Sequence, residues 1–441
     1  MPTDLPFHSL TELSGMLARG DTTSRAIVEA CLARIDALDG KLHAFVDVYR
    51  DDALKLADAA DLERSVHAAR GPLHGLPIAL KDLLEINGRQ TTAGSKSWLG
   101  RVSDHTATCV AKLVMAGMIP LGKTHMVEFA FGGWGRNQPM GAPWNPWDLR
   151  THRVAGGSSS GSAVATAAGL VPAAIGSDTG GSVRIPSALC GLTGLKTTYG
   201  LISLYGAVPL STTLDTIGPI AHTVDDVALL TAAMAGPDPR DPATLGAPPT
   251  DLRSALLRSP DVRGMRIACL ASEQFPGFIE SDVVRARHQA IDVLRGLGAD
   301  VEEVRAPIDF EEIATRLGRL LAAEAYAYHR GHIEDMSEPI DPWVRKRVLG
   351  GKAISAADYI GELSSMRRAQ AAFAAWMQGR DALLTPALPI TAVPVADVDE
   401  STAPLATFTR AGNYLGACGL ALPAGFSATG LPNLSFIIAP N

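Results

Sequence analysis

The chain has 441 residues, of which 46% are apolar and 19% charged, a composition typical of a globular protein rather than a disordered or collagen-like one. This length permits a large core and about three domains of average size, although large α/β enzymes often form one unit. The 39 basic and 46 acidic side chains give a formal net charge of −7. Because no basic excess is present to neutralise phosphates, no nucleic-acid partner is expected.

The expected elements alternate between helices and strands. In chain order they are a helix from the capping box at Ser9 to Gly20, a helix that carries Ile27, Cys31, Ile35 and Leu38 before Gly40, a helix from Thr106 to Gly117, a strand from Met118 to Gly122, a helix from Thr223 to Met234, a strand from Met265 to Leu270, a helix from Ser281 to Leu297 and a strand from Val301 to Val304. This alternation predicts the α/β class, with α/β/α layers around a central mixed, mostly parallel β-sheet.

We expect a single domain over residues 1–441, with N-terminal helices in 9–66, a core in 70–235 and an α/β portion in 250–441. The Pro- and Gly-rich stretch 235–249 could be a linker, but we favour a surface loop inside one domain.

The first residues of the chain and its cysteine pattern indicate the cellular compartment of the protein. The first ten residues contain no basic segment followed by an apolar run, and no window of about 18 apolar residues occurs, so we expect a cytoplasmic protein with no membrane partner. The chain has five cysteines, an odd number, and they are widely spaced with no C-x-x-C pair. This pattern favours buried, reduced thiols over a disulfide framework or a zinc site.

Three segments rich in small residues carry the candidate chemistry: 71–95, 155–169 and 176–196. The Gly/Ser run 156–162 could be a flexible linker, but it leads directly into a small-residue helix. It is not a phosphate-binding loop, because Ser162 stands where such a loop has lysine. The run also matches G-x-S-x-G, which would make Ser159 a nucleophile in need of a histidine, with the candidates His222, His288, His329 and His332.

A lysine and a serine form a more specific pattern. Lys81 lies in the apolar segment LPIALKDLL, where burial would lower its pKa from about 10.4 toward 7 to 8 and make it a base. The alternative is a strand-end lysine that reaches solvent beside Asp82. Ser182 follows Asp178-Thr179-Gly180-Gly181, where backbone N–H groups could point at the oxygen that becomes negative in acyl transfer. The alternative there is a plain Gly-Gly turn.

These three segments resemble the amidase signature family, whose members hydrolyse amide bonds with a Ser-cisSer-Lys triad. The similarity extends to the segments NPW at 145–147, GLKTTYGLIS from Gly194, LDTIGPIAHTVDDVALL from Leu214 and GNYLGACGLALPAGFSATGLPNLSF near the end, so it covers nearly the whole chain. Carried over by position, the resemblance implies Ser182 as the nucleophile, Ser158 as the bridging serine after a cis peptide bond, and Lys81 as the base. It implies neither a metal nor an organic cofactor.

The resulting hypothesis is a proton relay. Neutral Lys81 takes a proton from Ser158, which takes one from Ser182, and an acyl-enzyme forms on Ser182. The N–H groups that would hold the oxyanion belong to Thr179, Gly180, Gly181 and Ser182. We expect Asp178 and Arg184 to pair and brace this loop. The resemblance places the substrate-facing loop of the family at Phe131, Gly132, Gly133 and Trp134. Two aromatic residues follow this loop, Trp144 and Trp147, and they also suggest an apolar pocket.

The implied partner is a small-molecule amide or carbamate (urethane), and the same acyl transfer would accept anilides or esters. Two further classes stay open: a component of a larger assembly, similar to the glutamine-hydrolysing subunit of tRNA amidotransferases, and a non-catalytic binding relative. A homodimer is the default oligomeric state. Chains of the family usually continue past GLPNLSF with another strand and a closing helix, whereas this sequence stops at Asn441, so we expect a trimmed chain or a different terminus.

Overall fold

The fold is built around a single sheet. The computed structural model describes residues 4–246 and 261–439, and within them eleven strands pair in the order β1-β3-β2-β4-β6-β5-β10-β11-β9-β7-β8. The strands are β1 (Phe45–Val48), β2 (Pro77–Lys81), β3 (Ile119–Thr124), β4 (Ala173–Asp178), β5 (Thr193–Lys196), β6 (Thr216–Ala221), β7 (Arg266–Leu270), β8 (Asp300–Val304), β9 (Ala382–Pro386), β10 (Cys418–Phe426) and β11 (Pro432–Ala439).

The sheet is mixed, as predicted, and its parallel pairs form two blocks. In one block β2 lies between β3 and β4, and in the other β7 lies between β8 and β9. Between the blocks, β6, β5, β10 and β11 pair antiparallel with their neighbours, and β1 pairs antiparallel at one edge. The expectation of a mostly parallel sheet therefore describes the two blocks but not the middle. There the short connection of β10 to β11 forms a hairpin, which the helix-strand alternation did not indicate.

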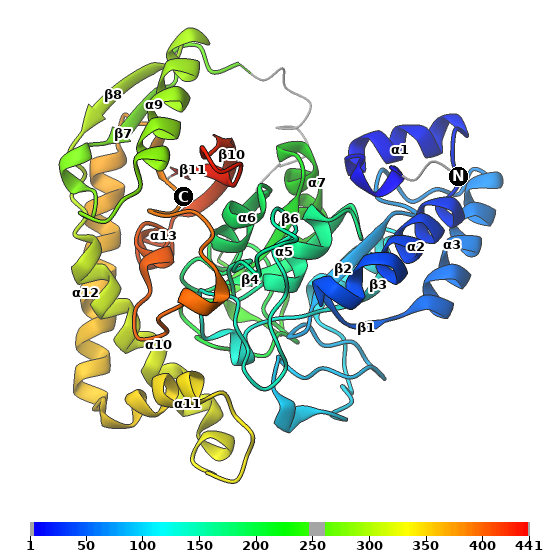
Figure 1. Cartoon of the computed structure of the whole chain (residues 1–441), viewed down its shortest axis with the longest axis horizontal. Helices are drawn as coiled ribbons and strands as arrows, with labels where there is room; N and C mark the ends of the chain where they lie inside the picture. The colour runs from blue at the N-terminus through cyan, green and yellow to red at the C-terminus, as the bar shows by residue number, and fades with distance from the viewer. Residues whose placement is uncertain (1–3, 247–260, 440–441) are drawn as a thin grey trace.

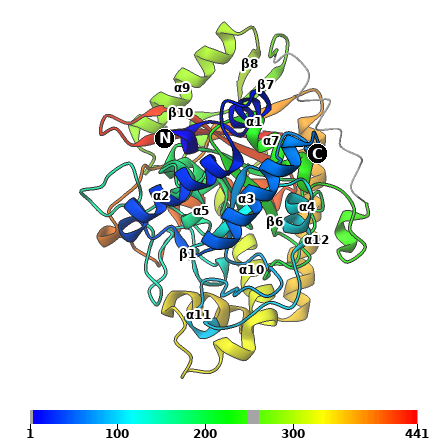
Figure 2. The same ribbon diagram turned by 90° about the vertical axis from the view of Figure 1, so that its right-hand side faces the viewer.

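Helices cover both faces and both ends of this sheet (Figures 1 and 2). They are α1 (Leu10–Arg19), α2 (Ser24–Leu42), α3 (Arg50–Ser65), α4 (Thr108–Met115), α5 (Ser160–Ala167), α6 (Arg184–Cys190), α7 (Val224–Met234), α9 (Ser281–Gly296), α10 (Phe310–Ile333), α11 (Pro342–Leu349), α12 (Ala356–Met377) and α13 (Thr409–Tyr414). In Figure 1, α2 and α3 lie at the β1 end, whereas α12 lies at the end that carries β7 and β8.

Alternate residues of the central strands explain why both faces are covered. In β2, Ile78 and Leu80 belong to one apolar cluster and Ala79 to another; in β4, Ile175 and Ala174 divide in the same way. Because successive side chains of a strand point to opposite faces, each face carries its own apolar surface and each must be buried by helices. The α/β/α layering predicted from the sequence is confirmed.

Local signals placed several elements correctly. The capping box at Ser9 starts α1 and Gly20 ends it with a positive φ of 77°, and Thr223 caps α7 through its side chain. The second helix runs to Leu42, past the predicted end at Gly40, and the strand β1 between α2 and α3 was missed. The predicted boundary at residue 250 and the last residues of the stretch 235–249 lie outside the described residues, as do Pro440 and Asn441. In the described part of the chain no helix is both long and apolar enough to cross a bilayer.

Candidate active site

Lys81 is the last residue of β2 and lies at the carboxyl end of the parallel block. The strands β2 and β4 are parallel, with Leu80 paired to Ile175, so β2 ends at Lys81 and β4 ends at Asp178 toward the same edge of the sheet. Carboxyl ends of parallel strands are where open α/β sheets place their ligands. The side chain of Lys81 is fully buried, with a relative exposure of 0%, so it does not reach solvent beside Asp82 as the alternative interpretation required.

Two serine hydroxyls surround the amine of Lys81. Its Nζ lies 2.7 Å from Ser158 Oγ and 2.8 Å from Ser177 Oγ. Burial lowers the pKa of Lys81 to about 7, against the opposing effect of the charges on Asp178 and Asp215. A neutral amine is therefore available at neutral pH, and its lone pair can accept a proton from a hydroxyl.

The three consecutive serines of the Gly/Ser run, Ser158 to Ser160, have different surroundings. Ser158 follows a cis peptide bond from Gly157, as the resemblance implies, and contacts Lys81. The Ser159 hydroxyl instead donates to the carbonyl of Ser177, and its backbone N–H donates to the carbonyl of Ser182. Ser160 Oγ is buried without a hydrogen-bond partner in the described residues. The interpretation of Ser159 as a histidine-assisted nucleophile is therefore not supported, because its hydroxyl is bound to the β4 backbone.

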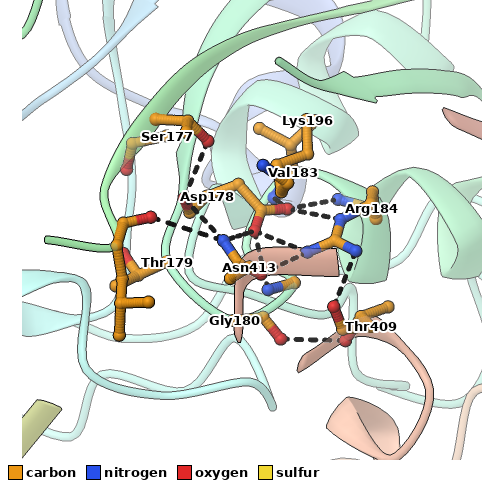
Figure 3. A network of polar contacts seen from close by, with 12 residues as sticks. Ser177, Asp178, Thr179, Gly180, Val183, Arg184, Lys196, Thr409 and Asn413 are labelled. Carbon is orange, nitrogen blue, oxygen red and sulfur yellow. Dashed lines mark hydrogen bonds and ion pairs between the residues drawn. The ribbon is translucent and has the colours of Figure 1, made fainter. Parts of the chain in front are cut away.

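The loop that carries Ser182 is held by an internal ion pair (Figure 3). Asp178 ends β4, and its two carboxylate oxygens accept hydrogen bonds from Arg184 Nη2 at 2.8 Å and Nε at 2.9 Å; both side chains are fully buried. Burial alone would raise the pKa of the Asp178 carboxyl, but the charge and hydrogen bonds of Arg184 hold it well below its usual range. The expected brace between these two residues is present.

The same carboxylate also orients the backbone of the loop. Asp178 Oδ1 accepts the N–H of Gly181 at 2.8 Å, and Oδ2 accepts the N–H of Val183 at 3.1 Å. The prediction of Gly181 as an oxyanion donor was therefore wrong, because its N–H points to Asp178 instead. The backbone N–H groups of Thr179, Gly180 and Ser182 donate to no other group in residues 4–246 and 261–439, and these three stay candidates.

A cavity of about 290 Å³ opens beside Ser182. Its lining includes all four residues of the predicted substrate-facing loop, Phe131 to Trp134, together with Thr179, Gly180 and Ser182. Gly133 also supports the triad segment, since its carbonyl accepts the N–H of Gly157 at 2.8 Å. A space of this size accommodates a small-molecule substrate.

Trp144 and Trp147 do not belong to this lining. Trp144 stacks on His152 with ring centroids 4.4 Å apart, and the indole of Trp147 donates to the carbonyl of Cys190. Both make their contacts outside the cavity, so the inference of a pocket from these two aromatics was wrong.

Three residues that support the site were not predicted from the sequence. Ser177 contacts Lys81, Asn413 donates to the Asp178 carboxylate, and the Thr409 hydroxyl donates to the carbonyl of Gly180 at 2.8 Å. Ser177 stands next to Asp178 in a segment already singled out, so its neighbourhood was a usable signal. Asn413 and Thr409 lie more than 220 positions from their partners, and no local pattern marks them.

Comparison with known proteins agrees with this geometry. A family model described as Amidase matches residues 26–441. The chain therefore belongs to the amidase family, the amidase signature enzymes, which confirms the resemblance seen in the sequence. Among the described residues no cluster of three or more His, Cys, Asp or Glu side chains could hold a metal ion.

Curated relatives and solved structures match over almost the whole chain. The A subunit of the glutamyl-tRNA(Gln) amidotransferase of Chloroflexus aggregans is 39% identical over 98% of this chain and 92% of its own length, and that of Acidothermus cellulolyticus is 38% identical over 99% and 92%. A protein from a vestigial complex linked to the origins of an s-triazine catabolic enzyme superposes with a TM-score of 0.91 at 32% identity, covering 98% of this chain and 95% of the other. The native peptide amidase of Stenotrophomonas maltophilia gives 0.85 at 30% identity, covering 99% and 94%.

Proposed function

We propose that this amidase-family enzyme is a hydrolase that cleaves C–N amide bonds of small molecules through an acyl-enzyme on Ser182. The observation that carries the proposal is the buried Lys81 amine, 2.7 Å from the Ser158 hydroxyl, with its pKa lowered by burial to about 7. An amine that is neutral at physiological pH and in contact with a hydroxyl is a general base in place.

The proposed reaction begins with proton transfer. Lys81 takes the Ser158 proton while Ser158 takes the proton of Ser182, and Ser182 Oγ attacks the amide carbonyl. The oxyanion that forms is held by backbone N–H groups of Thr179, Gly180 and Ser182. The relay then returns the proton to the leaving nitrogen, the C–N bond breaks, and the acyl-enzyme remains. Water attacks the ester by the same relay and releases the acid.

This mechanism requires only a carbonyl with a suitable leaving group. Carbamates, anilides and esters therefore fall within the proposed range, with amides as the main class. A panel of substrates with one acyl group and matched amide, carbamate and ester leaving groups would rank them by kcat/KM.

The serine run offers a matched test of the triad. Ser182→Ala and Ser158→Ala should each lower kcat by at least several orders of magnitude while circular dichroism shows an intact fold. Ser160→Ala is the control, because Ser160 lies in the same run and its hydroxyl has no partner among the described residues. Activity near wild type in Ser182→Ala would defeat the proposal, as would an equal loss in Ser160→Ala and Ser158→Ala.

The alternative is a component of an amidotransferase complex. It is supported by the curated relatives, which are named as A subunits of glutamyl-tRNA(Gln) amidotransferase. In that case glutamine would be the amide that is hydrolysed, and a tagged chain would copurify with its partner subunits. If the tagged chain purifies alone, or as the predicted homodimer, and hydrolyses simple amides, the stand-alone hydrolase is favoured.

A further inference from the structure

A cation without a partner lines the cavity beside Ser182. The guanidinium of Arg410, in α13, makes no hydrogen bond, ion pair or ring contact with any residue in 4–246 or 261–439. The other arginine of the lining is different: Arg347 pairs with Glu400 at 2.7 Å and also donates to the carbonyl of Phe131. Because these three are the charged residues of the lining, Glu400 neutralises Arg347 and one positive charge is left over.

The position of Arg410 is fixed close to the nucleophile. Its neighbour Thr409 donates its hydroxyl to the carbonyl of Gly180, and the Thr409 carbonyl accepts from Arg184 Nη1 at 2.7 Å. A Cβ placed on Gly180 would lie 3.6 Å from Arg410 Cγ. The stem of Arg410 therefore packs beside the residue two positions before Ser182.

The surroundings favour an anion next to this guanidinium. The side chain is partly buried, and burial together with repulsion from Arg347 lowers the pKa of Arg410 to about 10, which leaves it charged at neutral pH. A cation partly removed from water without a counter-charge is unfavourable, and a carboxylate relieves that cost. The planar guanidinium also matches the two oxygens of a carboxylate.

We infer that the substrate carries a carboxylate, which Arg410 binds while Ser182 attacks the amide carbonyl. This inference rests on the proposed hydrolysis and narrows its substrate class. The cavity of about 290 Å³ limits the size of the molecule, and Ile185, Leu210 and Leu321 in its lining favour a short apolar spacer between the two groups. Small monoamides of dicarboxylic acids and N-acyl amino acids carry a carboxylate and an amide carbonyl separated by such a spacer.

Matched substrates test the inference on the wild-type enzyme. In the first series the acyl part varies: glutaramic acid is compared with glutaramide and with 5-aminopentanamide. In the second the leaving group varies: N-butanoylglycine is compared with N-butanoylethanolamine. We expect kcat/KM for the carboxylate to exceed that for the neutral analogue by about 30-fold or more in one series. Equal or lower values for the carboxylate in both series would overturn the inference.

Variants identify the residue responsible. In Arg410→Gln the ratio of kcat/KM for carboxylate over neutral substrate should fall by about 30-fold, Arg410→Lys should retain part of it, and Arg410→Glu should favour the cationic analogue. The control is Arg263→Gln, an arginine at the surface with 77% of its side chain exposed, which should leave the ratio unchanged. An unchanged ratio in Arg410→Gln overturns the inference. If the Arg410 variants do not fold, the wild-type KM for the carboxylate should rise with ionic strength, and a constant value overturns it.

A binding measurement separates this inference from the proposed function. Calorimetry with Ser182→Ala, which needs no turnover, should show tighter binding of the carboxylate than of its neutral analogue in at least one of the two pairs, glutaramic acid with glutaramide or N-butanoylglycine with N-butanoylethanolamine. Tighter carboxylate binding without hydrolysis by the wild type would sustain the anion site and refute the hydrolase. Hydrolysis with no preference in binding would refute the anion site alone.

Discussion

The pH dependence of the reaction tests the role of Lys81. Burial lowers the pKa of this amine from 10.5 to about 7. As the pH falls through this value the amine is protonated and loses the lone pair that accepts the Ser158 proton. With one such group, kcat/KM should fall to roughly one tenth of its plateau at pH 6 and to roughly one hundredth at pH 5. The measurement is the initial rate with an uncharged amide at constant ionic strength, with circular dichroism at each pH.

Two buried carboxyl groups titrate in the same range and must be distinguished from Lys81. Burial raises the pKa of Asp215 to about 6 and that of Glu128 to about 7. The pKa of an amine falls markedly on warming, whereas that of a carboxylic acid changes little, so profiles at two temperatures separate them. The Glu128→Gln variant removes one of these carboxyl groups, and its kcat/KM should still fall at acid pH as in the wild type. A profile flat down to pH 5, or a limb that is insensitive to temperature, would refute the assignment of Lys81 as a neutral base.

The same burial affects stability. The folded pKa of Lys81, about 7, lies below the value of 10.5 for a free lysine, so between these values the unfolded chain binds a proton that the folded chain does not. In this window Lys81 should make the free energy of unfolding rise by about 1.4 kcal/mol per pH unit, whereas below pH 7 its full penalty applies. Lys81→Met should abolish activity and remove this contribution. Parallel urea unfolding of the two proteins from pH 7 to 9 measures the difference in slope, and identical slopes would contradict a buried neutral amine.

Three further predictions follow from the site, one of them with a matched control substitution. Asp178→Asn leaves a buried arginine without its counter-charge and should cost about 3 to 5 kcal/mol in urea unfolding; a loss under 1 kcal/mol would contradict the bracing role. Gly181→Ala should abolish activity, because φ is +135° and the new Cβ would lie 2.3 Å from the Thr409 hydroxyl oxygen, whereas Gly180→Ala meets only ordinary contacts near 3.6 Å and should remain folded by circular dichroism. Ser177→Ala removes one of two hydroxyls at Lys81 and should lower kcat/KM about tenfold and displace the acid limb; an unmoved limb would show that Ser177 does not influence the base.

Features set by neighbours in the chain were predictable, and those set by sheet register were not. The capping box at Ser9 and the cap at Thr223 depend on residues three positions apart, so the sequence contains the whole interaction. Strand β1 has four residues, all partly exposed, and lacks the apolar alternation that identifies a strand. The contact of Ser177 with Lys81 depends on how β2 and β4 align across a separation of 96 positions, which no local pattern specifies.

The direction of a backbone N–H group could not be predicted from the sequence either. The Gly-Gly pair before Ser182 correctly indicated a loop whose backbone approaches another group, but Gly181 directs its N–H to Asp178 Oδ1. The choice between an internal carboxylate and a substrate oxygen depends on where the Asp178 side chain turns. Asn413 helps to set that orientation from 235 positions away, so the full donor set could be assigned only in three dimensions.

The ion pair of Asp178 with Arg184 also explains how Lys81 can be a base next to an acid. The carboxylate of Asp178 acts on Lys81 to raise its pKa, which would favour the ammonium form. Arg184 binds both oxygens of that carboxylate and supplies a positive charge beside it, while the groups that contact the Lys81 amine are uncharged hydroxyls. Because opposite charges that pair closely cancel at a distance, Lys81 experiences mainly the low dielectric of its surroundings. Arg184 therefore supports the neutral amine without touching it, and the loop that presents Ser182 and the base that activates it depend on one buried pair.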